Sequence, residues 1–291
     1  MSLLQSIWMG LIQGLTEFLP VSSSGHLAIF KILAGVNTDT GILFDVLLHV
    51  GTLAAVVAAY YKDVWRLIIE FFEIIGDLCY NLVMFFARFR NKGGQYRKII
   101  CSSYRKFVVL IIVSTIPTVI IGYLLRNIVE VAEMILLIPG CCLLITAGIL
   151  LLSDLAQEGH KKPKTATYGN AIVIGICQGI ATLPGISRSG MTITSCVLSG
   201  FDRKFAVKYS FILSIPAIIG AMVLEIGETS SASITAPQVL IYIVGMVIAA
   251  VVGYICIKLM VAIVTRKLFK FFAIYCAVIG IIAIVGYMRM V

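Results

Sequence analysis

Charged residues are scarce in this chain. Asp, Glu, Lys and Arg together make up 13% of its 291 residues, about half the share found in a typical soluble domain. Hydrophobic residues make up 60% of the chain, and the mean hydropathy is +1.05. This composition excludes an ordinary soluble domain. It predicts an all-α polytopic membrane protein with a single integral membrane domain over residues 1–291.

Acidic residues are the scarcer of the two charged kinds, which leaves a formal net charge of +9. In a membrane protein an excess of basic residues is explained by the loops that face the cytoplasm. It is therefore no sign of nucleic-acid binding, and we expect no nucleic-acid partner. The eight cysteines lie mostly within apolar runs and lack the spacing of a metal cage. No cleavable signal peptide is expected, because the first apolar run continues into Glu17 and a Ser/Gly turn.

Six apolar stretches are long enough to cross a membrane. They are residues 42–61, 107–125, 134–155, 204–225, 238–257 and 268–288. Two further apolar segments, 3–33 and 169–200, are each interrupted by a turn, and neither half reaches the length of a span. We therefore predict six transmembrane helices and two re-entrant helical hairpins.

The first span is followed by charged residues at steps of three and four, which predict an amphipathic helix at the membrane interface or beside the bundle. They are Asp63, Arg66, Glu70, Glu73 and Asp77. The next segment, 88–106, is rich in Lys and Arg and has no acid, so it is expected in the cytoplasm. Alternation then places the basic loops 156–168, 200–208 and 258–270 on the same side, and the loop 226–237 outside.

The two hairpins resemble each other in sequence. Gln13-Gly14 begins one and Gln178-Gly179 begins the other, and each continues to a Ser-rich turn that ends in glycine. The pattern predicts pseudo-repeats at about 1–155 and 169–291, joined by the basic linker 156–168. An odd number of crossings separates them, so the repeats are inverted and the two turns approach each other near the membrane midplane.

The second turn, Pro184 to Gly190, places Arg188 at membrane depth, where an unpaired arginine is strongly disfavoured. Gly185 lets backbone approach a ligand closely, and a helix that begins near Ser189 would direct free amides at an anion. We interpret this stretch as a phosphate site. The alternative is a short cytoplasmic loop whose arginine contacts lipid headgroups.

The first hairpin carries the other candidates. Gln13 and Glu17 share a helical face, and a carboxylate beside phosphate can hold a divalent cation or take a proton. His26 is a candidate general base or proton donor, or else a structural hydrogen-bonding residue. The serines of the two turns cap helices, or one of them is a nucleophile. They are Ser22, Ser23, Ser24, Ser187 and Ser189.

Three more polar residues are open to two interpretations. Thr192 follows Arg188 by one helical turn and either adds a hydroxyl to the phosphate site or packs internally. Asp45 and His49 share a face of the first span, and they either line the cavity or form a buried hydrogen-bonded pair.

Residues 13 to 26 and 184 to 192 resemble the two signatures of the undecaprenyl-diphosphate phosphatases, the bacitracin-resistance protein family. The resemblance implies hydrolysis of undecaprenyl diphosphate to undecaprenyl phosphate and inorganic phosphate, which recycles the lipid carrier of cell-wall synthesis. It also implies a bacterial plasma-membrane protein whose site opens to the outer face and uses Mg²⁺ or Ca²⁺. The expected partners are the polyprenyl diphosphate and membrane lipids, with a homodimer left open.

The resemblance also implies roles for individual residues. Glu17 matches the acidic residue of the first signature, with Gln13 at a partner position that is glutamate in many members. Ser23 and His26 match the proposed nucleophile and the proton-handling histidine. Ser187, Arg188, Ser189 and Thr192 match the phosphate-binding motif of the family. We expect four more residues of the two turns to bind phosphate with them, namely Ser22, Ser24, Gly25 and Gly185.

Two mechanisms and two functions stay open at this point. In the first mechanism Ser23 attacks the terminal phosphorus, His26 takes its proton, and Glu17 anchors the metal or the histidine. In the second, activated water attacks directly. A polyprenyl-phosphate flippase or transporter is the rival function, because inverted repeats with broken helices are common in transporters.

Overall fold

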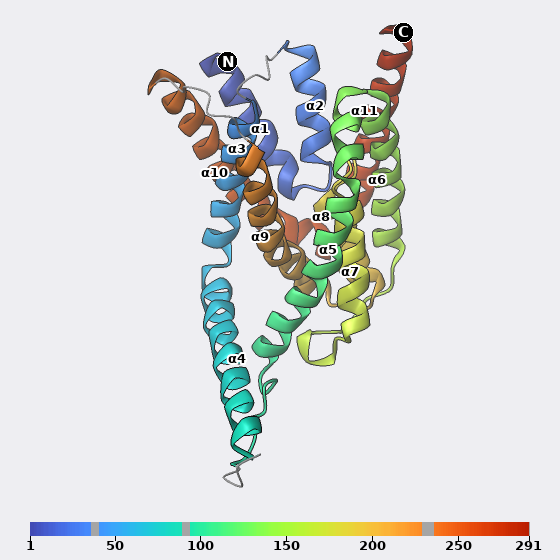
Figure 1. Ribbon diagram of the computed structural model, residues 1–291. Helices are drawn as coiled ribbons and strands as arrows, with labels where there is room; N and C mark the ends of the chain where they lie inside the picture. The colour runs from blue at the N-terminus through green and yellow to red at the C-terminus, as the bar shows by residue number, and fades with distance from the viewer. Residues whose placement is uncertain (36–40, 89–93, 229–235, 291) are drawn as a thin grey trace.

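The computed structural model describes residues 1–35, 41–88, 94–228 and 236–290 (Figure 1). Over these residues the chain forms eleven α-helices, one short 3-10 helix at Pro163–Thr165, and no strand, so the all-α prediction is confirmed. The α-helices are α1 Leu3–Phe18, α2 Ser23–Leu33, α3 Gly41–Ala59, α4 Tyr61–Arg88, α5 Ser103–Met134, α6 Leu137–Leu155, α7 Tyr168–Ile180, α8 Arg188–Leu198, α9 Arg203–Glu228, α10 Ala236–Thr265 and α11 Phe269–Met290.

Five helices are long and apolar enough to cross a membrane, namely α5, α6, α9, α10 and α11. α3 and α4 meet at a bend of 90°, and they add a sixth crossing if the pair counts as one broken span. The chain is therefore a multi-pass membrane protein with five candidate crossings, or the predicted six when this pair is included.

The four helices of the two hairpins are short. α1 and α2 contain 16 and 11 residues, and α7 and α8 contain 13 and 11. Each is shorter than the roughly 20 residues of a span, and each pair is separated by a turn in the middle of its apolar segment. The structure thus contains the two interrupted helix pairs that were predicted as re-entrant hairpins.

Each hairpin packs against spans from the other half of the chain. α1 lies along α10, and α7 lies along α5. Figure 1 shows α1 and α2 in the upper part of the bundle and α7 in the lower part. This exchange of partners brings the two turns into one protein-lined interior, which irregular backbone requires at membrane depth. The repeat boundaries themselves stay a prediction.

The amphipathic helix predicted after the first span is α4, and it packs against the start of α5. Its acidic row converges on Arg105, whose guanidinium lies 3.1 Å from Glu70, 2.9 Å from Glu73 and 2.5 Å from Asp77. Figure 1 shows α4 extending away from the other helices. The acids therefore hold α4 to the start of α5.

Two predicted spans are longer than expected. The span 107–125 lies within α5, Ser103–Met134, and the span 238–257 lies within α10, Ala236–Thr265. The apolar run ends before the helix does, because polar residues can continue a helix beyond the hydrocarbon. In α5 the extension includes the ion pair between Arg126 and Glu130, at 3.3 Å and four residues apart. Of the predicted loops, Arg90 and Lys92 in 88–106 and most of 226–237 lie outside the described residues.

Candidate active site

The two hairpin turns are in direct contact. The hydroxyl of Ser22 accepts a hydrogen bond from the backbone amide of Gly185 at 3.1 Å. A Cβ added to Gly25 would lie only 3.1 Å from the Cα of Gly185, so the backbones of the two turns nearly touch. The hydroxyl of Ser189 also donates to the carbonyl oxygen of Leu19 at 3.3 Å. Residues far apart in sequence thus form one site.

Glu17 and Arg188 form an ion pair across this contact, although 171 residues separate them. The Glu17 side chain is 4% exposed and the Arg188 side chain 23%. Each charge compensates the other, which a buried carboxylate and an arginine at membrane depth both require. The contact between Glu17 Oε1 and the Arg188 guanidinium places the positive charge of the second turn against the carboxylate of the first turn.

The second carboxylate oxygen of Glu17 accepts two further hydrogen bonds. The hydroxyl of Ser23 donates to Oε2 at 2.5 Å, and the amide nitrogen of Gln13 donates to the same atom at 3.1 Å. Gln13 is fully buried, and its Oε1 has no hydrogen-bond partner in the described part of the chain. The cluster therefore contains a serine bonded to a carboxylate and a free amide oxygen beside them.

Two helices begin at this cluster. α2 begins at Ser23 and is capped by Ser22, whose hydroxyl accepts from the amide of Gly25 at 3.4 Å. α8 begins at Arg188 and is capped by Ser187, whose hydroxyl accepts from the amide of Gly190 at 3.1 Å. The positive ends of both helix dipoles lie beside the ion pair, so the site favours an anion.

Both turns contain residues in the left-handed region of backbone conformation. Ser22 has φ 70°, which is strained for a residue with a Cβ. Gly185 has φ +96°, and a Cβ there would lie 2.4 Å from the carbonyl oxygen of Pro139. Gly185 is therefore required by the fold of the turn, and Ser22 is held in place by the hydrogen bonds that its hydroxyl and carbonyl make.

His26 lies on the first turn of α2, but neither of its nitrogens contacts Ser23. Nδ1 is 2.8 Å from the carbonyl oxygen of Ser22, and Nε2 is 2.9 Å from the hydroxyl of Tyr275. The hypothesis that His26 takes the proton of Ser23 thus requires a rearrangement of His26. The acceptor already bonded to the Ser23 hydroxyl is Glu17.

Thr192 is fully buried, and its hydroxyl donates to the carbonyl oxygen of Arg188 at 2.8 Å and also bonds to Ser210. The Thr192 hydroxyl is thus bonded within the protein, and its part in phosphate binding stays a prediction. The hydroxyls of Ser24 and Ser187 lie 3.4 Å from Ser22 and 3.3 Å from Ser189 respectively, within their own turns.

Asp45 and His49 are both near the site and are joined to each other. His49 Nδ1 donates to the carbonyl oxygen of Asp45 at 2.9 Å, and His49 lies within electrostatic range of Glu17. The Asp45 carboxylate forms an ion pair with Lys31 of α2, while its Oδ1 is buried without a hydrogen-bond partner among the described residues. Asp45 therefore connects α3 to α2.

Three residues that support the site were not identified from the sequence, namely Thr146, Lys31 and Tyr275. The hydroxyl of Thr146 donates to the carbonyl oxygen of Gly185 at 2.9 Å and accepts from the amide of Ser187 at 3.0 Å, so α6 holds the second turn in shape. Thr146 and Lys31 are isolated polar residues within apolar segments, and that isolation is the signal that could have identified them. Tyr275 lies in an apolar and aromatic segment and carries no such signal.

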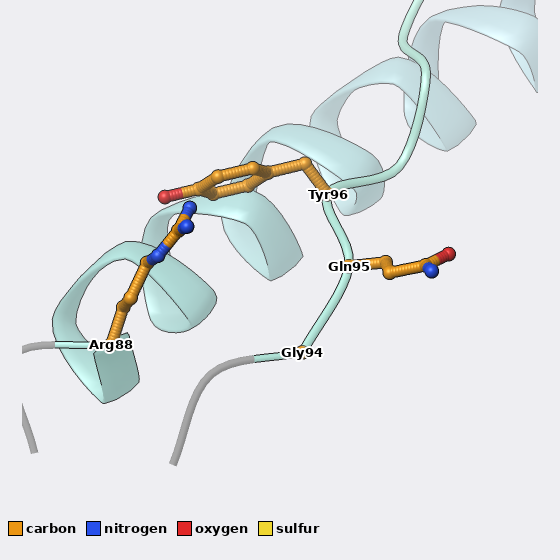
Figure 2. A pocket seen from close by; sticks show the side chains of 4 residues that line it. All are labelled: Arg88, Gly94, Gln95 and Tyr96. Carbon is orange, nitrogen blue, oxygen red and sulfur yellow. The ribbon is translucent and has the colours of Figure 1, made fainter. Parts of the chain in front are cut away.

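A cavity of about 460 Å³ lies at the C-terminal end of α4, lined by Arg88, Gly94, Gln95 and Tyr96. Figure 2 shows the Arg88 side chain reaching toward the Tyr96 ring, with the guanidinium 6.0 Å from the ring centroid. The described residues that line this cavity include no carboxylate.

Comparison with known proteins identifies relatives of the whole chain. The model of the family "Bacitracin resistance protein BacA" matches residues 6–282. A protein of Methanosphaera stadtmanae named undecaprenyl-diphosphatase is 39% identical over 285 residues, which cover 98% of each chain. Proteins of the same name from Desulforapulum autotrophicum and Halothermothrix orenii are 37% and 38% identical, over 98% of this chain.

Proposed function

The chain belongs to the bacitracin resistance protein family, and we propose that it hydrolyses undecaprenyl diphosphate to undecaprenyl phosphate and inorganic phosphate. It is a phosphatase of the membrane, and its product returns the lipid carrier to cell-wall synthesis. The observation that supports this proposal best is the contact of Ser23, Glu17 and Arg188 between two helix N-termini. The rival flippase has no support in the names of these relatives, which describe a hydrolase.

Substrate binding follows from the charges of the site. Arg188 and the N-termini of α2 and α8 are the positive groups that hold the diphosphate. Arg188 is paired with Glu17 in the structure. When the diphosphate binds, a phosphate oxygen takes the place of the Glu17 carboxylate as the partner of the guanidinium. Arg188 then stabilises the negative charge that spreads over the transferring phosphoryl group.

Ser23 is the proposed nucleophile. Its hydroxyl already donates to Glu17 at 2.5 Å, so the carboxylate can accept the proton as the serine oxygen bonds to the terminal phosphorus. The bond from that phosphorus to the bridging oxygen breaks, and undecaprenyl phosphate leaves. Water then hydrolyses the phosphoserine, which releases inorganic phosphate and restores the Ser23 hydroxyl.

Direct attack by water is the alternative mechanism. In that case Glu17 takes its proton from a water molecule, and Ser23 only orients the carboxylate. The two mechanisms differ in one observable. A phosphoserine forms in the first, whereas the oxygen of solvent enters phosphate in a single step in the second.

The donors of the site fit a divalent cation of the Mg²⁺ or Ca²⁺ class. These cations prefer oxygen ligands, and Mg²⁺ is commonly held by one or two carboxylates together with substrate phosphates. Glu17 and the unpaired Oε1 of Gln13 are the residues that would hold the cation. When bound, it neutralises charge on the diphosphate.

We also propose that the site opens to the outer face of the plasma membrane, because α1 and α2 lie at the end of the bundle opposite the connection of α6 to α7 (Figure 1), which is the basic segment 156–168. The expected partners are the polyprenyl diphosphate and the surrounding lipids. A homodimer stays a prediction, which the mass of the protein in detergent tests.

The function is tested with purified protein in detergent, where no second compartment exists and transport produces no signal. We expect release of inorganic phosphate from undecaprenyl diphosphate by the wild type and none by Ser23→Ala or Arg188→Ala. Acid-stable phosphate trapped on Ser23 would support the covalent mechanism. Turnover by Ser23→Ala at the wild-type rate would exclude Ser23 as nucleophile, and an inactive wild type would refute the proposed function.

A further inference from the structure

His26 is fixed by hydrogen bonds at both ring nitrogens. Nδ1 lies 2.8 Å from the carbonyl oxygen of Ser22, and Nε2 lies 2.9 Å from the hydroxyl of Tyr275. A carbonyl oxygen only accepts, so the proton of the neutral ring is on Nδ1. Nε2 is then an acceptor, and the Tyr275 hydroxyl donates to it. The two contacts together determine the tautomer of His26.

Tyr275 also holds the plane of the imidazole. The two rings are stacked, with centroids 5.6 Å apart and planes at 8°. Tyr275 belongs to α11, and 249 residues separate it from His26. The next residue, Cys276, is buried with its Sγ 3.7 Å from the carbonyl oxygen of Pro20, so α11 lies directly against the first turn.

We propose that Tyr275 is a positioning residue of the phosphatase site, which orients the ring of His26 and fixes its Nδ1–H tautomer. The proposal rests on the proposed function, because it assigns His26 to that site. The tyrosine hydroxyl can donate to a neutral imidazole and accept from a charged one, so it supports His26 in either protonation state. A phenylalanine at the same place would keep the stacking and lose the hydrogen bond.

The consequence for the reaction is a division of roles within the first hairpin. Ser22 engages one side of the imidazole and Tyr275 the other, while Ser23 is bonded to Glu17. Any part that His26 takes in the reaction therefore depends on the orientation that α11 imposes. A residue outside both signatures is thus needed for the histidine of the first signature.

The test uses Tyr275→Phe with two readouts. The chain has three histidines, His26, His49 and His160, so histidine labelled with ¹⁵N gives a spectrum simple enough to assign. We expect the wild type to show a protonated Nδ1 and a hydrogen-bonded, unprotonated Nε2 for His26. In Tyr275→Phe the Nε2 resonance of His26 should shift, while the resonances of His49 and His160 stay in place.

The second readout is turnover. We expect kcat of Tyr275→Phe to fall about tenfold, the change that loss of one neutral hydrogen bond produces, with KM nearly unchanged. In a His26→Ala background the same substitution should cause no additional loss. The matched control is Tyr123→Phe on α5, where the side chain is 66% exposed, and it should alter neither the spectrum nor the rate.

Two results would overturn the proposal. One is a Tyr275→Phe variant whose rate and His26 resonances equal those of the wild type. The other is a slower variant in which the His26 resonances do not move, since Tyr275 would then act by a different route. Failure of the proposed function can be told apart from failure of this proposal. If the wild type is inactive, the histidine spectra of the wild type and of Tyr275→Phe still test whether Tyr275 fixes the tautomer of His26.

Discussion

Replacing Arg188 with alanine should destabilise the protein as well as inactivate it. The substitution leaves the carboxylate of Glu17, which is 4% exposed, without its ion-pair partner. Ser23 and Gln13 still donate to that carboxylate, but neither carries a charge. The stability of the hairpin contact therefore depends on Arg188 for an electrostatic reason that is separate from catalysis.

The magnitude follows from burial. Removing one partner of a buried ion pair typically destabilises a protein by about 3–5 kcal/mol. The Arg188 side chain is 23% exposed, so we expect a value near the lower end of that range. A loss of about 3 kcal/mol corresponds to a fall in Tm on the order of 5–10 °C. Turnover should be lost, because removing one donor to the transition state already lowers kcat about a hundred- to a thousandfold, and Arg188 also carries the charge proposed to hold the diphosphate.

The control is the double variant Glu17→Gln with Arg188→Ala. Glutamine keeps an oxygen that accepts from Ser23 and Gln13, and it carries no charge that requires a partner. Thermal unfolding in detergent should therefore show the double variant to be more stable than Arg188→Ala alone, although both are inactive in phosphate release. A double variant that unfolds at the same temperature as the single one would refute the argument from the buried charge.

Four further perturbations test other contacts and the proposed cation. Gly25→Ala should lower the free energy of unfolding by about 1–3 kcal/mol and reduce turnover, because the new methyl group would press on the Cα of Gly185. The control is Gly148→Ala, whose methyl group would meet nothing within 4 Å and should be tolerated. Arg105→Ala should leave three carboxylates of α4 without their shared partner. We expect faster proteolysis near residue 97 while phosphate release persists. The control is Lys98→Ala, at an exposed position, which should have no such effect. Chelation of divalent cations should suppress phosphate release, and Gln13→Glu should make the Tm depend more strongly on added Mg²⁺, since it places a second carboxylate beside Glu17.

The helices and the hairpins were predictable from the sequence because they follow from length. A helix needs roughly 20 apolar residues to cross a membrane, and the segments around residue 20 and residue 184 fall short of that on both sides of a turn. The contact between Glu17 and Arg188 was also predictable in kind, because isolated charges at membrane depth require partners. The predicted inverted repeat was the reason to expect the two turns in one place.

The partners of individual side chains were not predictable in the same way. Ser23 bonds to Glu17 rather than to His26, because the helical register of α2 directs His26 toward α11. Nothing in the apolar sequence of residues 268–288 indicates that Tyr275 lies beside the first hairpin. Such contacts depend on how spans pack against each other, and apolar spans carry little sequence information about their neighbours.

The charge of the site explains why its ion pair and a divalent cation are compatible. Without substrate, one carboxylate and one guanidinium give a neutral pair, which is the least unfavourable state for charges at membrane depth. A diphosphate brings more negative charge than Arg188 alone can compensate. The N-termini of α2 and α8 add about half a positive charge each, and we propose that a cation held by Glu17 and Gln13 supplies the remainder. On this proposal Arg188 leaves the Glu17 carboxylate when it binds the substrate, and the carboxylate then becomes available to the cation. Substrate binding and cation binding therefore both involve the Arg188–Glu17 pair.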